Sequence, residues 1–125
     1  MSEQKMPDAE QVLSMMTARM GEALPEWPAK LKELAPDLLV ATAMTSAQSV
    51  GREASPVPAK YRHLIAVAAA LARGQESCAR SQVHLALASG ATAEEALDAV
   101  RIARHMAAAG VLDAATSLFG ELRKD

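Results

Sequence analysis

A chain of 125 residues, half of them hydrophobic, is long enough for one domain with its own core and too apolar for an intrinsically disordered protein. Its formal net charge of -2 at pH 7 lacks the basic excess that a nucleic-acid-binding surface needs, so no nucleic-acid partner is expected. A single cysteine excludes an internal disulfide framework.

The first predicted helix covers about residues 8–24, where apolar side chains recur at helical spacing. Gly21 is a weak point within it, because glycine is a poor helix former. We expect residues 1–24 to form an N-terminal helical extension whose methionine-rich face packs on the core or on a neighbouring subunit. Residues 25–125 are then the domain proper.

Prolines punctuate the next part of the chain. A short helix is predicted to end at Leu34, and a longer one covers about residues 37–50. Pro36 fits the first turn of the longer helix, because the backbone N–H that proline lacks has no partner there. The clearest loop, residues 51–57, follows.

The segment from Lys60 to Ala72 is apolar almost all round after its first turn. A helix of this kind has to be surrounded by other elements, so the sequence predicts a buried helix of mostly small side chains. Gly74 ends it, and a further helix is expected over about residues 76–89.

Thr92 and Glu95 form a capping-box pattern, which predicts that another helix begins at this point and runs to about residue 108. We expect Gly110 to break it and a last helix to cover residues 112–122. No alternating strand pattern occurs, so the fold class is all-α, with about six or seven helices. The sequence shows neither a signal peptide nor a membrane span, and a cytoplasmic location is expected.

The alanine-rich faces of this chain predict self-association. Residues 64–72, 85–91 and 106–115 would allow close approach of helices, and part of the cover for the buried helix would come from another subunit. We therefore expect a homo-oligomer. A compact monomeric bundle is the alternative.

Cys78 lies at the beginning of the helix predicted over residues 76–89. A helix N-terminus favours a thiolate, and Arg73 and Arg80 would add to this effect if they pointed inward. The other interpretation is structural, because a free cysteine often behaves as a small buried hydrophobic residue.

The three histidines have different prospects. His63 begins the buried helix, and a helical hairpin would bring it towards Cys78, where it could take up the thiol proton. His84 follows Cys78 by six residues and faces away from it, whereas His105 lies on the next helix among apolar residues. None of them shows the spacing of a metal site, so neither a metal nor another cofactor is expected.

Several segments together resemble the carboxymuconolactone decarboxylase and AhpD-like alkylhydroperoxidase family. They are residues 58–70, the stretch from Cys78 to residues 90–96, and the flanking residues 34–39 and 107–110. The resemblance covers roughly residues 25–122. It implies an AhpD-like helical bundle that is an obligate oligomer, commonly a trimer or hexamer.

The same resemblance shows how far this chain departs from the redox branch of the family. That branch uses a Glu, a CxxC pair and a His, and their positions fall on His63, Gln75, Cys78 and Gln82. Without a thiol at position 75, the two-cysteine mechanism is ruled out. The decarboxylase branch is similar in having a His where this chain has Gln82, so the chain matches neither active site.

Three functions remain open. In the first, a peroxiredoxin-like antioxidant oxidoreductase, Cys78 is oxidised by a hydroperoxide and regenerated by an external thiol. His63 then serves as base and needs to lie within about 3–4 Å of the sulfur. The second is a non-redox enzyme or binder for an organic acid or lactone, with Gln82 and His105 also contacting the ligand. The third is a catalytically inactive oligomeric scaffold.

Overall fold

The computed structural model describes residues 6–123, and over that range all regular structure is helical. The elements are α1 (Ala9–Met20), the short 3-10 helix η1 (Gly21–Ala23), α2 (Trp27–Leu34), α3 (Pro36–Ala47), α4 (Ala59–Ala72), α5 (Glu76–Ala88), α6 (Ala93–Ala114) and α7 (Thr116–Leu122). This confirms the predicted all-α class and helix number.

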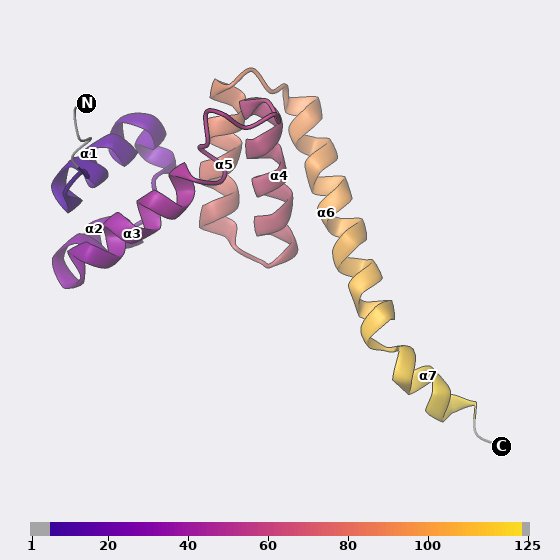
Figure 1. Ribbon diagram of the computed structural model, residues 1–125. Coiled ribbons are helices and arrows are strands. Elements are labelled where there is room, and N and C mark those ends of the chain that lie inside the picture. The colour runs from indigo at the N-terminus through magenta and orange to yellow at the C-terminus, as the bar shows by residue number, and fades with distance from the viewer. Residues whose placement is uncertain (1–5, 124–125) are drawn as a thin grey trace.

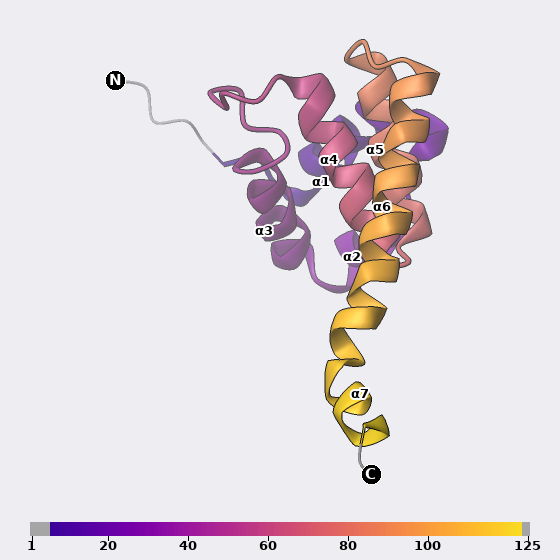
Figure 2. The same ribbon diagram turned by 90° about the vertical axis from the view of Figure 1, so that its right-hand side faces the viewer.

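The helices form two groups and an arm (Figure 1). The N-terminal group contains α1, α2 and α3, which pack on one another, and α1 and η1 also contact α5. The second group is the α4–α5 hairpin with α6 packed mainly along α4. Beyond this group, the end of α6 and α7 extend away from the rest of the molecule, as both views show (Figures 1 and 2).

Local hydrogen bonds determine where α1 begins and ends. Asp8 and Gln11 form a reciprocal capping box, with distances of 2.8 and 3.0 Å between side chain and backbone. The α-helix then ends at Gly21, whose φ of 52° suits glycine. The helix predicted over residues 8–24 therefore ends early, at its weak point Gly21, and the 3-10 helix η1 follows it. The core of this group is formed by Ala9, Val12 and Leu39.

The α4–α5 hairpin turns at Gly74, which has a φ of 72°, and the N–H of Gln75 donates to the carbonyl of Ala70 at 2.9 Å. In the single chain, α4 is covered on one face only. His63, Val67 and Ala70 are buried on one face. Ile65 remains 61% exposed, because only α5 and α6 make extensive contact with α4.

The beginning of α6 confirms the predicted capping box. The Glu95 carboxylate accepts from the N–H of Thr92 at 2.9 Å, and the Thr92 hydroxyl accepts from the N–H of Glu95 at 3.1 Å. Glu95 also pairs with Lys60 of α4 at 3.1 Å. The Thr92 hydrogen bond, together with this ion pair, lowers the pKa of Glu95, and the Glu95 side chain raises the pKa of Lys60.

The predicted break at Gly110 is wrong. α6 continues through this residue to Ala114, where the chain turns before α7. Glycine within a helix costs only about 1 kcal/mol relative to alanine, and the alanines before Gly110 favour the helix enough to offset that cost. The helix propensity of the neighbouring residues therefore outweighs the helix-breaking tendency of Gly110.

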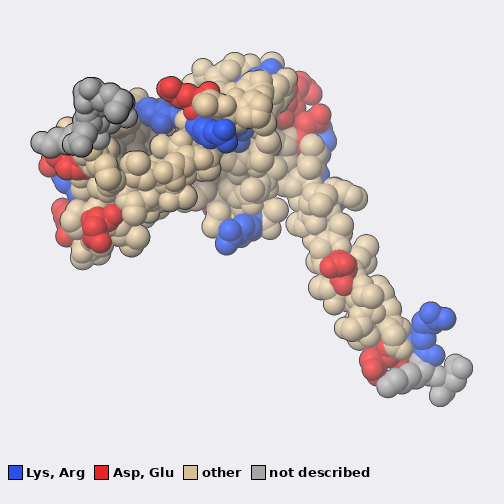
Figure 3. Space-filling model, in the orientation of Figure 1, with Lys and Arg blue, Asp and Glu red and all other residues tan. Residues whose placement is uncertain are grey.

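The arm made by the end of α6 and α7 exposes large apolar side chains. Val111 is 68% exposed and Leu122 is 73% exposed, and other exposed apolar residues of this region are Met106, Leu112, Leu118 and Phe119. The space-filling view shows few charged side chains along it (Figure 3). Within residues 6–123, the helices lack the combination of length and apolarity that membrane crossing requires.

Candidate functional site

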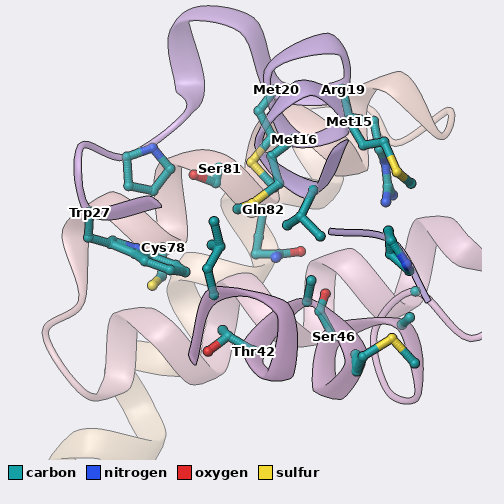
Figure 4. Close-up of a pocket in the computed structure, with 18 residues that line it drawn as sticks. Met15, Met16, Arg19, Met20, Trp27, Thr42, Ser46, Cys78, Ser81 and Gln82 are labelled. Atoms are coloured by element: carbon teal, nitrogen blue, oxygen red, sulfur yellow. The ribbon is translucent and has the colours of Figure 1, made fainter. Parts of the chain in front are cut away.

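A cavity of about 280 Å³ lies between the N-terminal group of helices and α5 (Figure 4). Its described lining comes from α1 and the segments beside it (Pro7, Val12, Met15, Met16, Arg19, Met20, Pro25, Trp27), from α3 and the loop after it (Leu39, Thr42, Ala43, Met44, Ser46, Ala47, Gly51), and from α5 (Cys78, Ser81, Gln82). The lining is mostly apolar. Cys78 is therefore one of a few polar or reactive groups in a largely apolar chamber.

Cys78 is the third residue of α5 and is half-buried, with its side chain on the cavity. The N-cap residue Gln75 makes no side-chain hydrogen bond to the first turn of the helix. Arg73 and Arg80 are exposed and do not line the cavity, so the inward-pointing arginines considered from the sequence are absent from this lining.

Gln82 links the cavity to a buried histidine. One turn after Cys78, its side chain lines the cavity, and its amide oxygen lies 2.8 Å from Nδ1 of His63. His63 comes from α4 and is only 4% exposed. Because the amide oxygen is an acceptor, Nδ1 carries the proton in this arrangement, which leaves the lone pair of the neutral ring on Nε2.

The structure therefore brings Cys78 and Gln82 to one cavity and joins His63 to it through Gln82. Within residues 6–123, no hydrogen bond connects His63 with the Cys78 sulfur. His105 is exposed on α6 and does not line the cavity. His84 is exposed as well, as its spacing from Cys78 predicts.

Ser81 is a site residue that sequence reasoning missed. It is buried, and its hydroxyl donates to the carbonyl of Ala23 at 2.7 Å while lying 3.0 Å from the carbonyl of Ser77. This contact fixes η1 against α5 beside the cavity. A serine in the middle of a helix carries no signal of this role, because its partner is far away in the sequence.

The contribution of α1 to the cavity was also missed. Met15, Met16 and Met20 project from α1 towards α3 and α5, and Arg19 lies near them (Figure 4). The methionine-rich face was visible in the sequence, where it indicated packing only. In the part of the chain that the structure describes, no cluster of three or more His, Cys, Asp or Glu side chains has the arrangement of a metal site.

The family model of the carboxymuconolactone decarboxylase family matches residues 36–121, from the start of α3 into α7. The chain belongs to the carboxymuconolactone decarboxylase family. A search of curated proteins finds no significant match. The match to the carboxymuconolactone decarboxylase family begins after α1, η1 and α2, although these elements provide one wall of the cavity.

The resemblance to the redox branch of the carboxymuconolactone decarboxylase family placed that branch's Glu and His at positions 63 and 82. In this chain the two positions hold His63 and Gln82, and their side chains are hydrogen-bonded to each other. An amide neither gains nor loses a proton near neutral pH. Gln82 can therefore orient His63 but cannot relay a proton.

Proposed function

We propose that this member of the carboxymuconolactone decarboxylase family is a one-cysteine thiol enzyme that reduces organic hydroperoxides. One observation carries the proposal: the half-buried Cys78 thiol lines an apolar cavity from the first turn of a helix. The thiol faces a space that a substrate can enter, which a nucleophilic role requires. An apolar cavity favours organic hydroperoxides over hydrogen peroxide.

The proposed reaction has two steps. The Cys78 thiolate attacks the distal oxygen of the hydroperoxide, the O–O bond breaks, and the leaving alkoxide takes a proton to become an alcohol. Cysteine is oxidised to a sulfenic acid as the hydroperoxide is reduced. Two molecules of an external thiol then restore the cysteine, with release of water and formation of one disulfide between them. Because residue 75 is a glutamine, Cys78 lacks the second cysteine with which a CxxC motif would form a disulfide.

His63 is the proposed base that takes the thiol proton, in place of the carboxylate of the redox branch. Its hydrogen bond to Gln82 supports this role, because a protonated Nδ1 leaves Nε2 as the basic nitrogen. No direct hydrogen bond connects His63 to Cys78 among the described residues, so this role requires the Cys78 side chain or a water molecule to approach Nε2 of His63.

A non-redox binder or enzyme for small organic molecules is the second candidate. The observation that favours it is the hydrogen-bonded pair of His63 and Gln82, which lacks the ionisable group that a proton relay needs at position 82. Gln82 lines the cavity, and the NH2 of its side-chain amide is the group that can donate to a ligand there. In this case Cys78 is part of the apolar lining and undergoes no redox chemistry.

We also propose that the protein is a homo-oligomer, with a trimer or hexamer implied by the family resemblance. The apolar arm supports this, since side chains such as Val111 and Leu122 are mostly exposed in the single chain. The exposed face of α4 around Ile65 supports it too.

The test of the function is consumption of cumene hydroperoxide with dithiothreitol as reductant, combined with the intact mass of the protein after peroxide alone. We expect turnover by the wild type, a mass gain of one oxygen, and loss of both in Cys78→Ser. Ser77→Ala is the matched control, because Ser77 is exposed beside Cys78 and does not line the cavity. Unchanged turnover in Cys78→Ser would contradict the proposal. A wild-type thiol that reacts only after denaturation would favour the scaffold alternative.

A further inference from the structure

Arg19 is the one charged side chain among the described residues that line the cavity. It projects from α1 on the side of the cavity away from Cys78 in the close-up (Figure 4). The ion pairs of the described chain involve Lys30, Lys32, Lys60 and Arg101, so Arg19 takes part in none of them. Arg19 is an exposed residue, so an anion can reach it from solvent.

The remaining surface of the cavity suits a hydrocarbon chain. Met15, Met16, Met20 and Met44 contribute flexible thioether side chains that adapt to the shape of an apolar ligand. No carboxylate is present among the described lining residues, so nothing inside the cavity neutralises Arg19. A cation at one end of an apolar cavity matches a molecule that has an acid group at one end and an apolar body.

The size of the cavity limits the length of such a molecule. A volume of about 280 Å³ has room for roughly ten non-hydrogen atoms, if each takes the ~30 Å³ of a water molecule in the liquid. An unbranched carboxylate of about eight carbons has this size.

We propose that the cavity binds an amphipathic carboxylate, with its acid group on Arg19 and its apolar chain among the methionines towards Cys78. Guanidinium and carboxylate form charge-assisted hydrogen bonds, which define the orientation of the ligand. This inference rests on the proposed function in one respect only: if Cys78 is the nucleophile, the reacting group of a substrate lies at the Cys78 end of the cavity. Binding itself requires no reaction at the thiol.

The test uses Trp27, which lines the cavity and is the single tryptophan of the chain. Its fluorescence is followed during titration with octanoate, octan-1-ol and octylamine, three probes of similar size with different head-group charge. We expect octanoate to bind about five- to tenfold more tightly than octan-1-ol, and octylamine to bind most weakly. Arg19→Gln should abolish the preference for octanoate, and Arg19→Glu should reverse the order of the two charged probes.

Arg104→Gln is the matched control, because Arg104 is an exposed arginine on α6 outside the cavity. Octanoate should also slow alkylation of Cys78 by iodoacetamide in the wild type and not in Arg19→Glu. Equal affinity of the wild type for octanoate and octan-1-ol, or an unchanged preference in Arg19→Gln, would overturn the proposal. So would the absence of any response of Trp27, as expected if a segment of another copy fills the cavity.

Two measurements on the wild type, octanoate binding and hydroperoxide turnover, separate this inference from the proposed function. Octanoate binding without hydroperoxide turnover would refute the redox function and leave this inference intact. Hydroperoxide turnover with equal affinity for the three probes would refute this inference and leave the redox function intact.

Discussion

Replacing Gln82 by methionine should destabilise the protein through an effect on His63. The substitution keeps the size of the side chain but removes the oxygen that lies 2.8 Å from Nδ1 of His63. His63 is 4% exposed, so its N–H would lose its partner in a buried position. A buried donor without a partner costs about 1–3 kcal/mol. Because Gln82 is half-buried beside a cavity that water can enter, we expect a loss of about 1–2 kcal/mol.

The assay is urea unfolding followed by helical circular dichroism, at one protein concentration for all variants because self-association shifts apparent stability. With a slope of about 2 kcal/mol per molar urea, the midpoint should fall by about 0.5–1 M. Gln75→Met is the control, since Gln75 is exposed and its side chain caps nothing. It should change stability by less than about 0.5 kcal/mol.

A double variant tests whether the effect passes through His63. Replacing both members of a hydrogen-bonded pair by apolar groups costs less than leaving one buried and unpaired. His63→Phe combined with Gln82→Met should therefore be more stable than the sum of the two single losses implies. The reasoning is refuted if Gln82→Met matches the Gln75→Met control, or if the two substitutions are strictly additive.

Three further predictions concern α6 and the arm. The pKa of Glu95 is lowered, so the contribution of its carboxylate to stability is present above the ordinary pKa near 4.5 and is lost as pH falls through the lower pKa. The pKa of Lys60 is raised, so the contribution of its ammonium group persists at neutral pH and is lost only above the raised pKa. Unfolding curves between pH 2 and 7 should thus show a weaker acid dependence for Glu95→Gln than for the wild type, and equal dependence would contradict the ion pair. Gly110→Ala should raise stability by about 0.5–1 kcal/mol, because an added Cβ meets nothing within 4 Å; a loss in urea unfolding would instead indicate close approach by another copy. Met106→Glu with Leu112→Glu should shift sedimentation towards smaller species, because both side chains are largely exposed on the single chain; an unchanged assembly would exclude this face from the interface.

Helix boundaries were the best predicted feature, because their causes lie within a few residues of each other. Thr92 and Glu95 show a complete capping box in the sequence, and the structure contains both of its hydrogen bonds. Gly74 was expected to end its helix, and it takes a positive φ where the chain turns. Gly110 was misjudged by the same logic, since a helix that many good helix formers support tolerates one glycine.

The candidate site was only partly predictable. Cys78 and Gln82 were found because both lie on one helix, one turn apart, within a recognisable pattern. The distance between His63 and Gln82 depends on how α4 packs against α5, so their hydrogen bond could not be predicted from residues close together in the sequence. His105 was included because its neighbours are apolar, yet that face of α6 is exposed in the single chain.

The sequence by itself determined the all-α class, most helix ends, the family and the loss of the two-cysteine mechanism, because these depend on neighbouring residues and on residue identity at motif positions. Only the tertiary structure decided which helix faces are covered. It placed the methionines and Arg19 of α1 in the wall of the cavity that Cys78 also lines, and it left Ile65 and the arm exposed. These features arise from packing between segments far apart in the chain, where an apolar face can be buried against any of several partners.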